Sequence, residues 1–198
     1  MRFDGDAAVP LALLLLSNHS LGQVNDWMNE IYPLWVRAHG IMIVCPVNWY
    51  QAPSSLKLMI NRLVCADGGN PDPSSTHGKD AARAKTLELQ GWPYPRHLAG
   101  RVFSVIVHGD ADGANQLADM LTDWLGNMGL IQAGHRSQLA TYVSYMRPYA
   151  TSHDDLDQDL AFQEEVRNAA RSLIEAVAML RRGELKQPGA RLKDPRPK

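Results

Sequence analysis

The chain contains 198 residues, of which 45% are hydrophobic and 21% are charged. These proportions are typical of a globular domain of ordinary size with its own core, and they exclude a disordered chain. The formal net charge is only -1, from 20 basic and 21 acidic residues. Because so small a charge produces no overall field, the composition argues against a nucleic-acid partner and against an anionic membrane surface.

The start of the chain is dominated by the apolar run Leu11–Leu16. This run is far shorter than the roughly 20 residues that span a bilayer, and no small-x-small cleavage site follows it, as a signal peptide would require. We predict a short buried strand over Val9–Leu16, interrupted early by Pro10. Cys45 and Cys65 are the only cysteines and lack metal-ligand spacing, which indicates a reducing compartment, so we expect a cytoplasmic protein.

A helix is predicted next, over Leu21–Ala38. Ser20 and Gln23 form a candidate capping box at its start, and Pro33 inside it predicts a kink or a fresh start. The apolar residues that recur at helical spacing are Val24, Trp27, Met28, Ile31 and Trp35.

The stretch Gly40–Val64 predicts a strand, a loop and a helix in succession. Ile41–Cys45 is an apolar run without alternation, which is typical of a parallel strand covered on both faces, and we expect this strand to be central. Pro46 ends the strand, and Ser54 is the expected N-cap of the helix. The loop between them therefore lies at the carboxyl end of a strand, where open α/β sheets bind ligands.

The next segment is a long connection. Residues 67–75 and 91–100 are rich in glycine and proline and predict turns on either side of a short surface helix, Asp80–Leu89. A connection of this length is typical of a functional lid or of an oligomer surface, and both alternatives remain open.

A second strand is predicted over Arg101–Val107, followed by the loop HGDADG, residues 108–113, and then by an amphipathic helix that Gly129 stops. A short final strand over Leu130–Ala133 and a long helix over Asp154–Arg182 follow. The residues expected on the inner face of the long helix are Leu156, Leu160, Val166, Ala170, Leu173, Val177 and Leu180.

This alternation predicts a single α/β domain over residues 1–182, with an atypical start over residues 1–20. Residues 183–198 combine basic residues with proline and predict a disordered tail.

The sequence CPVNWYQAPSSLKLMINRL, residues 45–63, resembles the P-V-Y-W-x-x-P-x-x-L-K-x-x-I-D-R-L stretch of the NADPH-dependent FMN reductase group of flavodoxin-like proteins. Asn48 and Asn61 depart from it, where the family often has Tyr and Asp. The resemblance covers roughly residues 23–180 and implies a three-layer flavodoxin-like fold, a parallel sheet with helices on both faces. The coinciding positions are Pro46, Val47, Trp49, Pro53, Leu56, Lys57, Ile60, Arg62 and Leu63.

The resemblance also implies FMN and NAD(P)H as cofactors, with this loop bordering the isoalloxazine ring. Trp49 and Tyr50 suit one wall of the flavin site, and the loop at residues 108–113 suits the other because its glycines let the backbone approach a ligand. The backbone N–H groups of residues 48–50 suit the acceptor edge of the ring. The plainer alternative is that both aromatics pack against a neighbouring loop or subunit. The expected cofactor-binding residues are Pro46, Val47, Asn48, Trp49, Tyr50, Ser54, His108, Gly109, Asp110 and Gly113.

No catalytic side chain is assigned, because the flavin itself accepts the hydride. His108, Asp110 and Asp112 could instead ligate a metal or act as an acid/base group, but H-x-D-x-D is no recognised ligand spacing and Asp112 suits an N-cap, so we predict no metal. No G-x-S-x-G, P-loop, H-E-x-x-H or CxxC motif is present, so the common hydrolase, NTPase, zincin and thioredoxin functions lack support. A G-x-G-x-x-G nucleotide-binding motif is absent too, so NAD(P)H is expected to bind only transiently, stacked on the flavin.

The front of the chain departs from the family, whose FMN phosphate site follows the first strand. Too few residues precede the first helix for a strand-helix-strand unit, which needs on the order of 30 residues. Leu11–Leu16 could take the place of the first strand, with Ser17–Ser20 supplying hydroxyl and N–H groups. The alternative, which we favour, is a truncated or altered start that lacks part of the N-terminal strand-helix unit.

The resulting hypothesis is an FMN-dependent NAD(P)H oxidoreductase that reduces a quinone, a nitro or azo compound, or free flavin. Its alternative is a flavodoxin-fold binding or assembly module with a lost or degenerate FMN phosphate site. The resemblance further implies a homo-dimer or homo-tetramer, with residues 91–95 as candidates for the contact between subunits.

Overall fold

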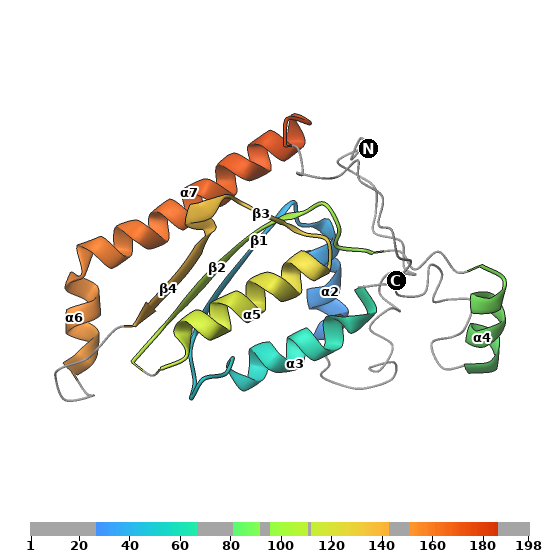
Figure 1. Cartoon of the computed structure of the whole chain (residues 1–198), viewed down its shortest axis with the longest axis horizontal. Coiled ribbons are helices and arrows are strands. Elements are labelled where there is room, and N and C mark those ends of the chain that lie inside the picture. The colour runs from blue at the N-terminus through green and yellow to red at the C-terminus, as the bar shows by residue number, and fades with distance from the viewer. Residues whose placement is uncertain (1–26, 67–80, 92–95, 111, 143–150, 186–198) are drawn as a thin grey trace.

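The computed structural model describes residues 27–66, 81–91, 96–110, 112–142 and 151–185. Helices and strands alternate along these residues (Figure 1). In chain order the elements are α2 (Met28–Arg37), β1 (Gly40–Pro46), α3 (Ser54–Arg62), η2 (Leu63–Ala66), α4 (Ala81–Leu89), β2 (Val102–Gly109), α5 (Ala114–Asn127), β3 (Ile131–Gln132), η4 (His135–Ser137), β4 (Gln138–Tyr142), α6 (Ser152–Gln158) and α7 (Leu160–Arg181).

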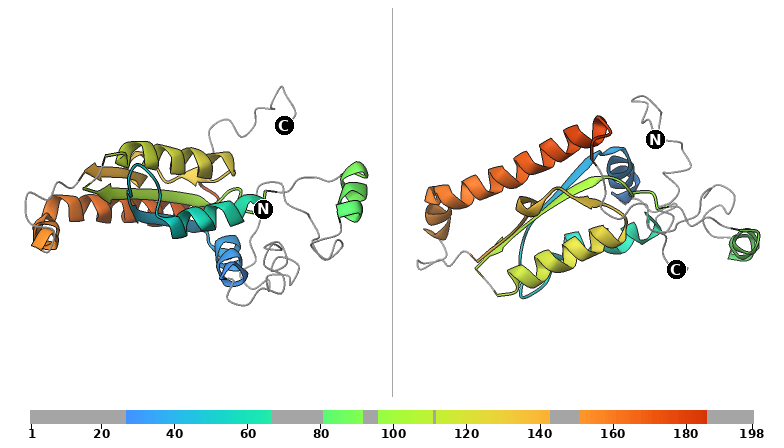
Figure 2. Two further views of the ribbon diagram at one scale, coloured as in Figure 1. Left: turned by 90° about the horizontal axis from the view of Figure 1, so that it is seen from below. Right: turned by 45° about the horizontal axis from the view of Figure 1, so that its top comes forward.

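All described strand pairs are parallel, and β2 lies at the centre of the sheet. β1 pairs with one side of β2 from Gly40 to Pro46, and β3 and β4 pair with its other side. Helix α7 covers one face of the sheet, while α5 and α3 lie on the other (Figures 1 and 2). The predicted three-layer α/β fold with a parallel sheet and helices on both faces is therefore confirmed.

The strand predicted at Ile41–Cys45 is confirmed as β1, and among the described strands the central one is β2. Among them, β1 pairs only with β2, and it is β2 that has neighbours on both sides. Residues Val102–Val107 are all buried, whereas Val44 in β1 is 57% exposed. An apolar run indicates that the faces of a strand are buried, but it does not indicate how many strands pair with its edges.

The predicted short strand at Leu130–Ala133 is confirmed as β3, but it is not the last strand. β4 follows and pairs with the carboxyl half of β2, while β3 pairs with the start of β2. Between them the chain turns through η4, where the buried hydroxyl of Ser104 donates a hydrogen bond to the carbonyl of Ser137 at 2.7 Å. The two short strands thus act as one strand beside β2, interrupted at η4.

The long helix predicted over Asp154–Arg182 is in fact two helices, α6 and α7. They separate at Asp159, whose carboxylate accepts a hydrogen bond from the Phe162 N–H at 2.8 Å and so caps α7. Leu160 was expected on the inner face but is 71% exposed. Helix α7 packs closely on β1 at Gly40, where a Cβ would lie 2.6 Å from Val177 Cγ2.

The remaining helices follow the sequence more closely. α2 continues through Pro33 as one helix, without the predicted fresh start. The short surface helix predicted at Asp80–Leu89 is confirmed as α4. Among the described residues, no helix is both long and apolar enough to cross a membrane.

Several predictions fall outside the described residues. They are the strand at Val9–Leu16, the Ser20 and Gln23 capping box, the turns at residues 67–75, the contact at residues 92–95 and the tail from residue 186.

Candidate functional site

The chain leaves β1 through a two-residue turn made of two aromatic residues. The Asn48 N–H donates to the Gln51 carbonyl at 2.9 Å, and the Gln51 N–H donates back to the Asn48 carbonyl at 3.0 Å. Trp49 and Tyr50 occupy the two central positions with φ of 48° and 68°. Left-handed backbone at both central positions is the type I′ pattern, which usually carries Asn-Gly because side chains there are crowded. The turn is therefore strained, at a cost of roughly 1–3 kcal/mol for each residue.

Burial of the aromatic rings does not explain this strain. Trp49 is 86% exposed and Tyr50 is 52% exposed. In the described part of the chain, the N–H groups of these two residues make no backbone hydrogen bond. A strained turn that holds an exposed indole and two N–H donors in water is typical of a binding site and not of a structural connection.

The two residues that precede the turn hold it against the end of β2. Pro46 is in register with His108, and the Val47 N–H donates to the His108 carbonyl at 2.8 Å. A Cβ at Gly109 would lie 2.8 Å from Val47 Cγ1, so only glycine leaves room for Val47. The predicted proximity of the two loops at the carboxyl ends of β1 and β2 is therefore present in the structure.

The two loops touch, however, and do not form the two walls of a slot. A Cβ at Gly113 would lie 2.7 Å from Tyr50 Cα and 2.8 Å from Tyr50 Cδ1, and Gly113 has φ of 104°. The Tyr50 hydroxyl donates a hydrogen bond to the Asp112 carboxylate at 3.4 Å. A planar ligand has no room between Tyr50 and Gly113, so it would lie on the surface that the two loops form together. We call this surface, made of Trp49, Tyr50, Asp112 and Gly113, the aromatic platform.

Two residues expected as helix caps have other positions. Pro53 is the N-cap of α3, and Ser54 is its first residue with no capping hydrogen bond. Gly113 is the N-cap of α5, so Asp112 is not the cap and its carboxylate accepts from Tyr50 instead. The expectation that the Asn48 N–H is available to a ligand is also wrong, because the turn uses it.

His108 contributes its backbone to the site, but its side chain lies elsewhere. The imidazole packs edge-on against Phe162 of α7, with ring centroids 6.1 Å apart. Its Nδ1 is buried and has no hydrogen-bond partner among the described residues. Asp110 is exposed in the loop that follows. Among the described residues, no three His, Cys, Asp or Glu side chains are grouped as metal ligands would be.

Sequence reasoning missed the part played by two residues: Gln51, which closes the turn, and Asp112, which belongs to the aromatic platform. Gln51 closes the turn with its backbone, which no side-chain pattern signals. The sequence favoured Asp112 as a helix cap, with a metal ligand or an acid/base group as alternatives, whereas its carboxylate accepts a hydrogen bond from the Tyr50 hydroxyl.

An open groove of about 610 Å³ lies beside the platform and runs along β1 between α2 and α3. Of the expected site residues, only Pro46 lines it. The groove is therefore separate from the aromatic turn.

Comparison with protein-family models matches residues 5–142 to the NADPH-dependent FMN reductase family. The match includes β1, β2, both loops of the platform and β4, and it begins before residue 23, where the resemblance was placed from the sequence. Neither the curated proteins nor the solved structures give a match. Membership in this family implies the use of FMN and NAD(P)H in general terms. Because the match spans well over half of the 198 residues, the chain belongs to the NADPH-dependent FMN reductase family.

Proposed function

We propose that the protein is an FMN-dependent NAD(P)H oxidoreductase whose flavin lies on the aromatic platform. The final electron acceptor in this proposal is a quinone, a nitro or azo compound, or free flavin. The observation that carries the proposal is the strained Trp49–Tyr50 turn, which keeps an exposed indole beside Gly113 at the strand ends. FMN, when bound, supplies the two-electron chemistry that no side chain of the platform provides.

The residues of the platform fit a flat, partly polar ligand. The exposed face of Trp49 offers a surface for stacking, which excludes water from one side of an aromatic ring. The N–H groups of Trp49 and Tyr50 are donors for an acceptor edge, and Asn48 precedes them in the turn. Gly109 and Gly113 keep side chains away from the turn.

Other parts of the proposal depend on neighbouring groups. Ser54 lies at the start of α3, whose first-turn N–H groups favour a negatively charged substituent. Because the sequence has no G-x-G-x-x-G motif, we propose that NAD(P)H binds transiently against the flavin. We also propose a cytoplasmic homo-dimer or homo-tetramer that acts on a small-molecule electron acceptor.

The first test is the absorbance spectrum of the purified protein, followed by calorimetric titration with FMN. We expect flavin absorption bands, or binding of FMN when it is added. Trp49→Ala should weaken FMN binding by roughly 10- to 100-fold, since stacking of one ring on an aromatic side chain contributes about 1–3 kcal/mol. Trp27→Ala, at a tryptophan that is 67% exposed but lies outside the platform, is the matched control and should leave the affinity unchanged.

Protein that is colourless and binds no added FMN would overturn this proposal and favour the binding or assembly module. If FMN binds, anaerobic mixing with NADPH and with NADH should bleach the flavin absorption. Turnover with a quinone, a nitro compound and an azo compound then identifies the acceptor class.

A further inference from the structure

The imidazole of His108 contains an enclosed nitrogen atom whose hydrogen-bonding capacity is unused in the described part of the chain. Its Nδ1 is enclosed and makes no hydrogen bond with the described residues, and Nε2 makes none either. An enclosed nitrogen in this state is unfavourable, because it loses its hydrogen bonds to water without replacement. An apolar side chain would pack against Phe162 without this cost. Packing alone therefore does not explain a histidine at this position.

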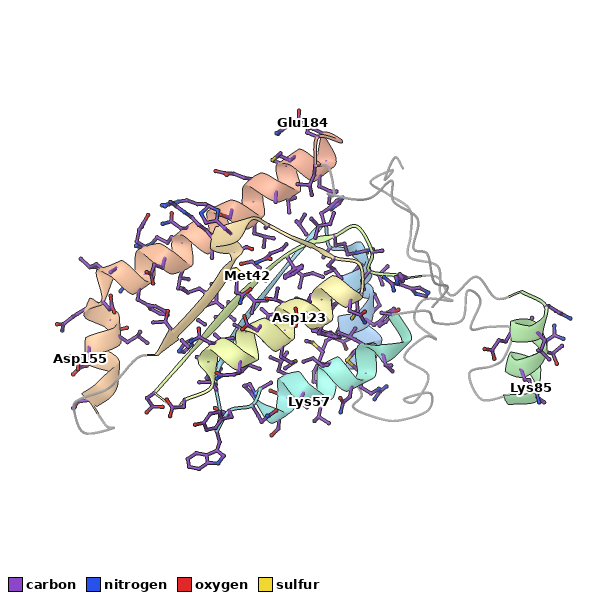
Figure 3. The ribbon with its side chains drawn as sticks, in the orientation of Figure 1. Met42, Lys57, Lys85, Asp123, Asp155 and Glu184 are labelled. Carbon is purple, nitrogen blue, oxygen red and sulfur yellow. The ribbon has the colours of Figure 1, made fainter. Side chains whose placement is uncertain are left out.

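The side chain of His108 lies on the α7 face of the sheet, at the same end as the aromatic platform. The odd-numbered residues 103–107 of β2 belong to the core with α5, so His108 points to the opposite face, where it meets Phe162. Figure 3 shows that α7 runs from the end of the sheet near Asp155 of α6 to the opposite end, at Glu184. The first turn of α7 therefore packs on the carboxyl end of β2.

The surface beside His108 is open on the side of β1. Pro46 is in register with His108 and shares its face of the sheet. Pro46 is exposed, and Val44, two residues earlier on the same face, is 57% exposed. The turn that carries Trp49 begins two residues after Pro46. Exposed residues thus connect the aromatic platform with the imidazole.

The surroundings of the ring determine which nitrogen of His108 carries the hydrogen. A hydrogen on Nδ1 would be an enclosed N–H group without an acceptor among the described residues. With the hydrogen on Nε2, the enclosed nitrogen is only an unused acceptor, which is less unfavourable. Nε2 is not enclosed, so its N–H group faces solvent as a donor.

We propose that His108 binds the flavin by donating a hydrogen bond from Nε2 to an oxygen of the ribityl phosphate chain. The inference rests on the proposed function, in which the flavin ring lies on the aromatic platform. The contact of Tyr50 with Gly113 leaves no space for the chain between the two loops, whereas the surface beside His108 is open. His108 then serves the site twice, because its carbonyl also accepts the Val47 N–H at 2.8 Å.

The test is calorimetric titration of the full-length protein with three flavins. FMN carries the ribityl phosphate chain, riboflavin carries the ribityl chain without the phosphate, and lumiflavin is the ring alone. We expect His108→Leu to weaken FMN binding by roughly 10-fold and to leave lumiflavin binding unchanged. A loss for FMN alone would assign the hydrogen bond to the phosphate, and an equal loss for riboflavin would assign it to a ribityl hydroxyl.

Two further variants sharpen the result. His108→Gln keeps an N–H donor and should recover part of the FMN affinity that His108→Leu loses. His135→Leu replaces an exposed histidine outside the platform and should leave all three affinities unchanged. Unchanged FMN binding in His108→Leu would overturn the proposal. An equal loss for lumiflavin and FMN would also overturn it, because His108 would then act only through the shape of the platform.

A measurement without flavin tests the state of Nδ1. Because the enclosed nitrogen is removed, His108→Leu should raise the urea midpoint of the flavin-free protein by on the order of 0.5 M. A lower midpoint in both His108→Leu and His108→Phe would show that Nδ1 has a partner in the folded protein, and would overturn the inference. Absence of FMN binding in the wild type would instead overturn the proposed function itself, and this inference with it.

Discussion

Gly113 lies so close to Tyr50 that the two residues share one van der Waals contact surface, with room for a hydrogen but not for a methyl group. Gly113→Ala would place its Cβ 2.7 Å from Tyr50 Cα, at a residue with φ of 104°. We expect this variant to lose about 1–3 kcal/mol of unfolding free energy, measured by urea denaturation.

The matched control is Gly126→Ala, because a Cβ at Gly126 would meet nothing within 4 Å. This helical glycine should tolerate alanine or gain up to about 1 kcal/mol. Equal stability of the two variants would show that the contact between Tyr50 and Gly113 is looser than described.

The strained turn predicts a conflict between stability and binding. The double variant Trp49→Asn, Tyr50→Gly installs the residues that favour a type I′ turn, at positions with φ of 48° and 68°. It should raise the unfolding free energy by about 1–2 kcal/mol, because both positions then accept left-handed backbone. The same variant should bind FMN at least about tenfold more weakly, since the stacking surface is removed. If thermal and urea unfolding show no gain in stability, the turn is not strained.

We expect His97, at the opposite end of the sheet from the aromatic platform, to make folding stability depend on pH. The Tyr32 hydroxyl lies 3.0 Å from His97 Nδ1, and burial, aided by the charge of Arg101, lowers the pKa of His97 below 6.5. As the pH falls through 6.5, the unfolded chain takes up a proton that the folded chain resists, so folding stability decreases. The decrease should continue until the pH reaches the folded-state pKa and then level off.

The measurement is the urea midpoint between pH 8 and pH 5 for the wild type and for His97→Gln. The variant should show a smaller decrease over this range, because it has no group to protonate at this position. His135→Gln replaces an exposed histidine and serves as the control. If both variants follow the wild-type curve, another group is responsible for the acid sensitivity.

We expect the thiol of Cys45 to react only when the protein unfolds. It is buried in β1, and burial raises the pKa of its thiol to about 11. In a Cys65→Ser background, where Cys45 is the only cysteine, a thiol reagent at pH 8 should modify the native protein very slowly and the urea-unfolded protein at once. Rapid labelling of the native protein would show that β1 opens easily.

The layered α/β fold could be predicted from the sequence because the apolar residues of buried helices and strands recur at a characteristic spacing. β2 and α5 are examples, since most of their apolar residues are buried in the core. β4 was missed because its sequence QLATY is short, mixes polar with apolar residues and gains its strand conformation from pairing with β2.

The site was only partly predictable. Proximity of the two loops follows from parallel pairing, which brings Pro46 beside His108. The positive φ of Trp49 and Tyr50 could not be predicted, because aromatic residues do not favour left-handed backbone and tertiary contacts impose it. The side chain of His108 could not be assigned to a face of the sheet until its contact with Phe162 of α7 was known.

The order of β1 and β2 along the chain has a consequence for biosynthesis. β1 ends at Pro46, and its partner β2 begins at Val102, so the ribosome must add residues 47–101 before the two strands can pair. At about 5–20 residues per second this interval lasts several seconds. During that time the nascent polypeptide carries an apolar strand without its principal partner, and this segment is where a cotranslational chaperone would bind.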